Sequence, residues 1–420
     1  MVNRGRRRGG RTTPKGTQPN DRRSSAPWDT PQSGDLLRDA ERASREINDV
    51  NEAEGWASAM QAVFRASGVA QRPVASPIAI LRAAKAHGGT AGALVAAALA
   101  VYGPTSSRVQ AAELRDKLIA AGVTVPPWTL DLGRVEPGRV VMLSNIWGDG
   151  CSIHLDCLRN AETIGIGTTI DAVGGVIAHG FSYGPNTAGV EKFALEAPDS
   201  VITEIDPADA RATVDAALAR ADQYEDLDDD SGPDDPETGL RALVEQRFSL
   251  LAEGGSPLIR PVDPTESRAE LTSGFLALEG TAELPDVNDL IDTFWDFSDY
   301  CDGDPLRWSP NRIHVFLAVW IPAKVIADEL WYRNLPVVLR EWLRFAATER
   351  ELSDRALELN LSAVGEALKA MQRNRLDPTK ASPGSAIMRE LLADQVDVEN
   401  QAETQAWIDQ HNTKNDSDEP

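Results

Sequence analysis

The sequence predicts an α+β protein with a helical N-terminal part, a small antiparallel β-meander and an aromatic-rich C-terminal helical bundle. Three observations support this prediction. Alanine-rich helical patterns run through residues 34–122, and short β-forming segments separated by tight turns follow in residues 123–204. Residues 294–345 then hold eleven of the chain's 24 aromatic side chains, as expected of a packed helical core. The 420 residues therefore divide into a basic tail (1–33), a helical region (34–122), a sheet (123–204), a helical C-terminal body (205–372), and C-terminal helices with a polar tail (373–420).

The tail is rich in Arg, Gly, Pro, Ser and Thr and lacks apolar periodicity, so we expect it to be disordered. Residues 1–23 carry eight basic side chains against one acid, so the net charge of −23 divides into +7 for this segment and −30 for the rest. Such an arm attracts phosphates but is nearly free of aromatic side chains that could stack on bases. This predicts nucleic-acid binding that is independent of sequence and dependent on salt. Two alternatives are a tail that stays unbound and one that folds back on the acidic body. The candidate contact residues are Arg4, Arg6, Arg7, Arg8 and Arg11.

The helical region is divided by capping and stop signals. Ser76-Pro77 matches an N-cap followed by proline in the first helical position. Gly103-Pro104 and Gly122 are expected to end helices.

Four segments predict the meander, at 139–146, 151–158, 162–170 and 176–183, with the turn Gly-Asp-Gly at 148–150. In the second segment the alternation of Cys151, Ile153, Leu155 and Cys157 predicts a buried face, with His154 and Asp156 on a polar outer face. Cys151 and Cys157 lie about 20 Å apart along one strand and cannot share a disulfide or a metal. Three cysteines in all argue against a disulfide framework and favour a reducing cytoplasm.

Helical patterns return at 206–222 and 239–254 and dominate the C-terminal body. Ser309 is expected to cap a helix that has Pro310 in its first position. Three apolar stripes at helical spacing follow: Ile313, Phe316, Leu317 and Trp320; Leu339, Trp342, Leu343 and Ala346; and Leu357, Leu361, Val364 and Leu368.

One catalytic pattern needs weighing, because GFSYG at 180–184 fits the G-x-S-x-G nucleophile elbow with Ser182 as nucleophile. An elbow requires a strand, a sharp turn and a close-packed helix, but Pro185-Asn186-Thr187-Ala188-Gly189 is poor helix material. The only later histidines are His314, on a helix flank, and His411, near the end of the chain. We therefore favour a hairpin turn whose glycines provide backbone freedom, and keep a serine hydrolase as the alternative.

The acidic segment 226–237 places Asp226, Asp228, Asp230 and Glu237 at four ligand positions of an EF-hand loop. Ser231 stands where the loop requires glycine, so a solvated acidic loop is the better interpretation. No Walker loop, dinucleotide fingerprint or H-E-x-x-H occurs, and we expect neither a metal nor a cofactor.

The segment CDGDPLRWSP (301–310) gathers Asp302, Asp304 and Arg307 beside Trp308. Charges against an aromatic wall can form a site with shifted pKa values. The favoured alternative is a corner between helices in which Arg307 pairs with an acid. No apolar run reaches the roughly 18 residues that span a bilayer, so we expect a cytoplasmic protein that does not enter a membrane.

Three C-terminal motifs are similar to those of a large family of uncharacterised actinobacterial proteins: DPLRWSP (304–310), WIPAK (320–324) and LPVVLREWLRF (335–345). The resemblance extends more loosely over residues 140–372 and implies an α+β body without an established activity. Members of that family often have Asp-His-Asn where this chain has Asp171-Ala172-Val173.

Since no catalytic set is complete and the charge is divided, the sequence predicts a non-enzymatic cytoplasmic protein. Its acidic body would bind an unknown macromolecular partner, and its basic arm would contact nucleic acid.

Overall fold

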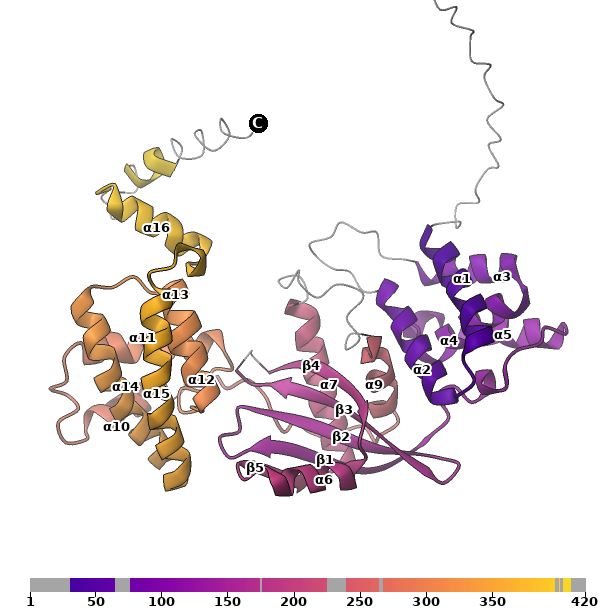
Figure 1. Cartoon of the computed structure of the whole chain (residues 1–420), viewed down its shortest axis with the longest axis horizontal. Coiled ribbons are helices and arrows are strands. Elements are labelled where there is room, and N and C mark those ends of the chain that lie inside the picture. Colours follow the sequence, from indigo (N-terminus) through magenta and orange to yellow (C-terminus); the bar gives the residue numbers. More distant parts are fainter. Residues whose placement is uncertain are drawn as a thin grey trace, which may run out of the picture.

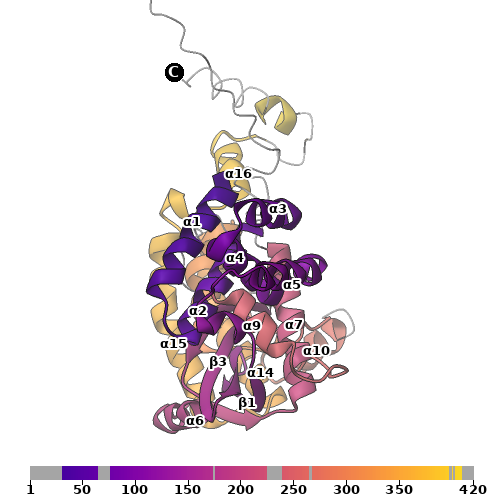
Figure 2. The ribbon, with the colours of Figure 1, turned by 90° about the vertical axis from the view of Figure 1, so that its right-hand side faces the viewer.

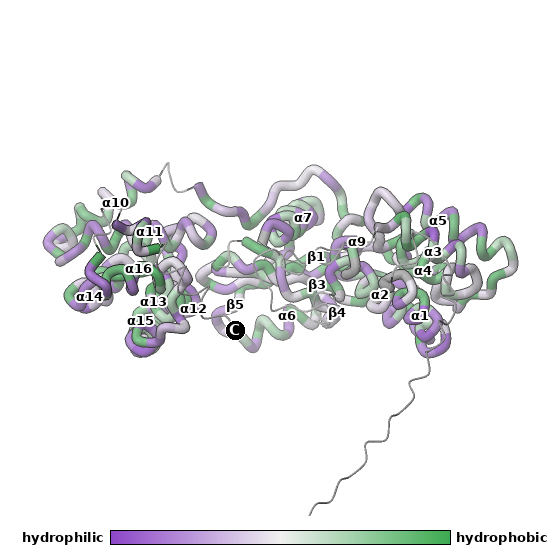
Figure 3. Tube along the Cα trace, turned by 90° about the horizontal axis from the view of Figure 1, so that it is seen from above, coloured by the Kyte–Doolittle hydropathy of each residue, from purple (hydrophilic) through white to green (hydrophobic). Residues whose placement is uncertain are grey.

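The computed structural model describes residues 31–64, 76–173, 176–224, 239–263, 267–396, 400 and 403–408. Helices predominate in this part of the chain and accompany a five-stranded antiparallel sheet, which confirms the α+β class. Three blocks follow one another along the long axis, with N-terminal helices at one end, the sheet in the middle and C-terminal helices at the other end (Figure 1). Seen from above, the same three blocks form an elongated row (Figure 3).

The N-terminal block consists of five helices: α1 (Pro31–Glu46), α2 (Val50–Ala59), α3 (Pro77–His87), α4 (Gly89–Tyr102) and α5 (Thr105–Ala120). Ser76 precedes Pro77 at the start of α3, and α4 ends just before Gly103-Pro104, so both sequence signals are confirmed. Helix α1 begins at Pro31, slightly before the expected start of the helical region at 34. Helix α4 packs among its neighbours α1, α3 and α5 (Figure 2) and is therefore apolar around most of its circumference.

The sheet has the strand order β4-β3-β2-β1-β5. Its strands are β1 (Glu136–Asn145), β2 (Gly150–Arg159), β3 (Glu162–Asp171), β4 (Ile177–Gly184) and β5 (Ser200–Glu204). The first four form the predicted meander, whereas β5 was not predicted and pairs with β1. Helix α6 (Thr187–Glu196) connects the two edge strands, and Asn186 caps it by accepting a hydrogen bond from the Gly189 N–H.

One face of the sheet belongs to the first hydrophobic core. Cys151, Ile153, Leu155 and Cys157 are all buried there, as predicted, against the N-terminal helices. Helices α7 (Pro207–Tyr224) and α9 (Arg241–Phe248) pack on this face as well. The C-terminal body that was expected to begin at 205 therefore begins later, because the apolar faces of α7 and α9 bury against the sheet.

A buried carboxylate connects the elements of this first core. Glu54 on α2 is fully buried and lies 2.6 Å from the Arg159 guanidinium at the end of β2. It also pairs with Arg247 on α9 and accepts a hydrogen bond from the Gly133 N–H at 2.8 Å. A buried carboxylate is tolerated only when it is paired in this way, so the three elements depend on one another.

The second core lies in the C-terminal bundle, which is formed mainly by α10 (Arg268–Leu276), α11 (Val287–Tyr300), α12 (Pro310–His314), α14 (Glu329–Glu349) and α15 (Asp354–Asn374). Helix α16 (Pro383–Ala393) follows. The predicted aromatic cluster is confirmed, since Trp295, Trp308 and Trp342 are among the largest fully buried side chains. Neighbouring rings meet mostly edge-on or tilted, as in Phe294 and Trp308, whose centroids are 6.1 Å apart.

The helix that begins at Pro310 changes its winding. Ser309 caps it by accepting a hydrogen bond from the Arg312 N–H, as predicted, but residues Val315–Trp320 form a π-helix before α13 (Ile321–Lys324). Pro322 has no N–H to bond the carbonyl of Ala318, four residues earlier. The Asn374 side chain supplies the missing donor, with Nδ2 2.6 Å from the Ala318 oxygen.

Candidate functional site

The face of the sheet opposite the first core is polar and partly open. Strand pairing places His154, Gly167 and Ser182 in one row across β2, β3 and β4. Ser152, Thr169 and His179 form the next row. Because side chains alternate along a strand, both rows point away from the first core.

Helix α6 covers part of this face. The Asp156 carboxylate accepts hydrogen bonds of 2.8 Å from the N–H and from the hydroxyl of Thr187, at the start of α6. His154 is consequently half-buried rather than on the open outer surface that the sequence predicted, and its Nε2 lies 2.8 Å from Ser152 Oγ. Burial lowers the pKa of His154, which keeps the imidazole neutral at neutral pH.

The uncovered part of the face forms a pocket of about 460 Å³, within the range of small-ligand sites. Its polar lining combines two carboxylates, two amides, three hydroxyls and one imidazole, and no lysine or arginine lines it. These residues come from the β1–β2 turn, the neighbouring strands and helix α12: Ser144, Asn145, Asp149, Ser152, Thr169, Asp171, His179 and Asn311. The pocket thus lies where the sheet meets the C-terminal bundle and is rich in hydrogen-bond acceptors.

The two carboxylates are held in place by short contacts. Asp149 is 6% exposed, and its two oxygens accept hydrogen bonds from the Asn145 amide and the Ser309 hydroxyl. Asp171 Oδ1 accepts a hydrogen bond of 2.9 Å from the Val173 N–H. Within the part of the chain that the structure describes, no group bonds the second Asp171 oxygen. Asp171 can therefore offer one oxygen to a ligand.

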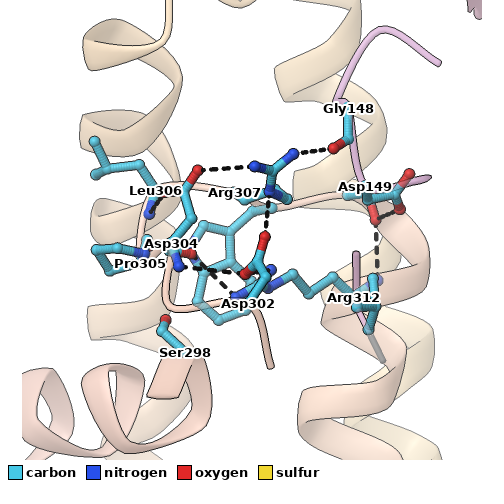
Figure 4. A network of polar contacts seen from close by, with 12 residues as sticks. Gly148, Asp149, Ser298, Asp302, Asp304, Pro305, Leu306, Arg307 and Arg312 are labelled. Atoms are coloured by element: carbon cyan, nitrogen blue, oxygen red, sulfur yellow. Dashed lines mark hydrogen bonds and ion pairs between the residues drawn. The ribbon is translucent and has the colours of Figure 1, made fainter. Parts of the chain in front are cut away.

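The segment 301–310, whose Ser309 bonds Asp149, forms the predicted corner between α11 and α12; its polar network is drawn in Figure 4. Arg307 pairs with Asp302 at 2.6 Å and with Asp304 at 3.4 Å, which confirms that it pairs with an acid. Asp302 also lies 2.6 Å from Arg312, and both of these side chains are completely buried. Asp304 in turn pairs with Arg350 at 2.8 Å.

The corner also joins the two blocks, which the sequence did not predict. Arg307 donates a hydrogen bond to the Gly148 carbonyl in the β1–β2 turn (Figure 4). Arg350 donates to the carbonyl of Trp147, at 3.3 Å. These contacts fix the turn that carries Asp149, so the network positions one wall of the pocket.

Ser182 does not have the geometry of a nucleophile elbow. It lies within β4, paired with Gly167, and its hydroxyl is 3.5 Å from the Gly167 carbonyl. Two expectations were wrong here: GFSYG is part of a strand rather than a hairpin turn, and a helix, α6, does follow it. Gly180 is needed because it occupies a β-bulge with φ of 61°, whereas Ser182 has no positive φ. The turn into α6 comes after Ser182, and no histidine of the described chain bonds it.

The three cysteines are buried and free. Burial raises the pKa of the thiols of Cys151 and Cys301 to about 12 and that of Cys157 to about 11, so none is a thiolate at neutral pH. Within the described ranges, no three His, Cys, Asp or Glu side chains are arranged to hold a metal ion. In the same part of the chain, every helix is too short or too polar to cross a membrane.

The acidic segment 226–237 and the five candidate arginines of the arm lie outside the described residues.

The sequence did not predict that these residues form one pocket. Its lining residues are spread from Leu143 to Asn311, and only the alternation in the second strand pointed to a polar face. Protein-family models, curated proteins and solved structures were compared with the chain, and none matches it.

Proposed function

We propose that the protein is a non-enzymatic cytoplasmic interaction protein whose acidic body binds a macromolecular partner through the open face of its sheet. The observation that carries the proposal is the pocket of Asp149 and Asp171, which offers fixed acceptors and, among the residues that the structure describes, no nucleophile with an aligned base. Among the described residues of this face, a serine–histidine contact joins Ser152 and His154. Both Asp156 oxygens are engaged by Thr187, so Asp156 does not orient that pair.

The basic arm adds a second contact in this proposal. Its arginines bind phosphates without reading sequence, and the acidic body limits contact with nucleic acid to the arm. The arginines concerned are Arg4, Arg6, Arg7, Arg8 and Arg11. The similarity of the C-terminal motifs to the actinobacterial family is compatible with this function, since that family has no established activity to carry over.

Affinity capture from cell lysate, with and without nuclease, tests the proposal. We expect a protein partner that remains after nuclease treatment, and nucleic acid that is lost when the five arginines are replaced by glutamine. A fluorophosphonate probe tests the competing hydrolase. Labelling of the purified protein that disappears in Ser182→Ala would refute a non-enzymatic function.

A further inference from the structure

We propose that the pocket binds the guanidinium group of an arginine side chain, an inference that rests on the proposed interaction function and names the chemistry its partner presents. The pocket's lining has two carboxylates and no basic side chain. An anionic ligand would lie against Asp149 and Asp171 without a compensating charge. A cation meets two fixed carboxylates, and the charge of −30 beyond residue 23 favours its approach.

The arrangement of the free hydrogen-bond acceptors indicates which kind of cation the pocket fits. Asp171 has one oxygen without a partner in the described chain, and a carboxylate such as Asp149 can accept more bonds than the two it receives. Further oxygens come from Ser152, Thr169 and Asn311. These acceptors belong to the β1–β2 turn, two strands and α12, so they approach a ligand from several sides. A planar guanidinium with five N–H donors matches such a distribution better than a compact ammonium does.

The surrounding cations do not occupy the site. Arg307, Arg312 and Arg350 do not line the pocket and are engaged by Asp302 and Asp304. Their charges are thus paired inside the corner network. The pocket carboxylates therefore keep their negative charge available to a ligand.

Titration of the full-length protein with N-acetylarginine amide tests the inference, with the neutral and nearly isosteric N-acetylcitrulline amide as matched ligand. We expect saturable binding of the arginine compound, seen by calorimetry, and none of the citrulline compound. Asp171→Asn removes the charge, keeps an oxygen for the Val173 N–H, and should weaken binding about tenfold. Glu204→Gln removes an equal charge from β5, outside the pocket, and should leave the affinity unchanged.

A second variant keeps the test decisive if Asp171→Asn folds poorly. His179 is exposed on β4, and His179→Lys would place an ammonium group in the pocket without disturbing a core. We expect it to abolish binding of the arginine compound. Equal binding of the two ligands, no binding of either, or full binding by folded Asp171→Asn or His179→Lys would overturn the inference.

The arginine can belong to another protein or to this chain's own arm. Full-length protein with the five arm arginines changed to glutamine separates these sources. Tighter probe binding identifies the arm as a competitor, and unchanged binding excludes the arm and leaves another protein as the source. The lysate capture and this titration test different proposals, so either one can fail while the other succeeds. A captured partner without probe binding refutes the guanidinium site alone, and probe binding without a partner refutes the proposed function alone.

Discussion

Replacing Asp302 by alanine should destabilise the C-terminal bundle strongly. The carboxylate is completely buried and lies 2.6 Å from both the Arg312 and the Arg307 guanidinium groups. Its loss leaves the buried Arg312 with the Asp304 carbonyl as its remaining hydrogen-bond acceptor, at 3.0 Å. Removing one partner of a buried pair costs about 3–5 kcal/mol, because the other charge stays desolvated. Urea unfolding can measure this loss through the fluorescence of Trp308 and Trp342, which lie in the same core.

The same bundle provides a matched control. Glu329 lies 2.6 Å from Arg375, but the Glu329 side chain is 73% exposed. Glu329→Ala should therefore cost at most about 1 kcal/mol. The double variant Asp302→Ala, Arg312→Met should lose less stability than Asp302→Ala alone, since the unpaired charge is removed as well. Equal losses for Asp302→Ala and Glu329→Ala would refute the argument that burial decides the effect.

Three further predictions concern the core, the open face and the π-helix. Trp342→Ala should lower the free energy of unfolding by about 3–5 kcal/mol, because the side chain is fully buried. Ser182 is exposed, so Ser182→Ala should lower it by less than about 1 kcal/mol. Similar losses for the two variants in urea unfolding would contradict this assignment of the core. Burial lowers the pKa of His154 below its usual 6.5, so the unfolded chain takes up this proton at a higher pH than the folded protein does. Stability should accordingly fall as the pH drops below about 6.5, and His154→Gln should flatten this part of a stability–pH curve; an unchanged slope would show that His154 does not contribute. Asn374→Ala should cost about 1–3 kcal/mol by leaving the Ala318 carbonyl without a donor, and Asn374→Asp, which offers no N–H₂ group, should not restore the loss.

Local patterns in the sequence predicted most of the fold's elements. The alternation from Cys151 to Cys157 identified a strand with one buried face, and Ser309-Pro310 identified the start of α12. Helix α6 was missed because Pro185 and Gly189 weaken its helical pattern, although the capping residue Asn186 was a usable signal. Strand β5 has only five residues and depends on pairing with β1, which no local pattern encodes.

The candidate site depended on contacts between distant residues, which explains why only part of it was predicted. The ion pairing of Arg307 follows from acids three and five residues away, within reach of a local pattern. Its bond to the Gly148 carbonyl joins residues 159 positions apart in the sequence. The same holds for Asn311, which reaches the pocket only because the bundle docks against the sheet.

The position of Glu54 constrains how the chain folds during synthesis. One of its two arginine partners, Arg247, lies 193 residues later in the sequence. At 5–20 residues per second, the ribosome needs about 10–40 s to produce this partner after Glu54 itself. The sheet and α7 emerge during that interval, but Glu54 lacks Arg247 and the first core lacks α9 until its end. The second core consists almost entirely of residues 275–371 and can form from one continuous stretch. The first core, although it begins earlier in the chain, therefore needs the longer stretch of sequence to be complete before it can close.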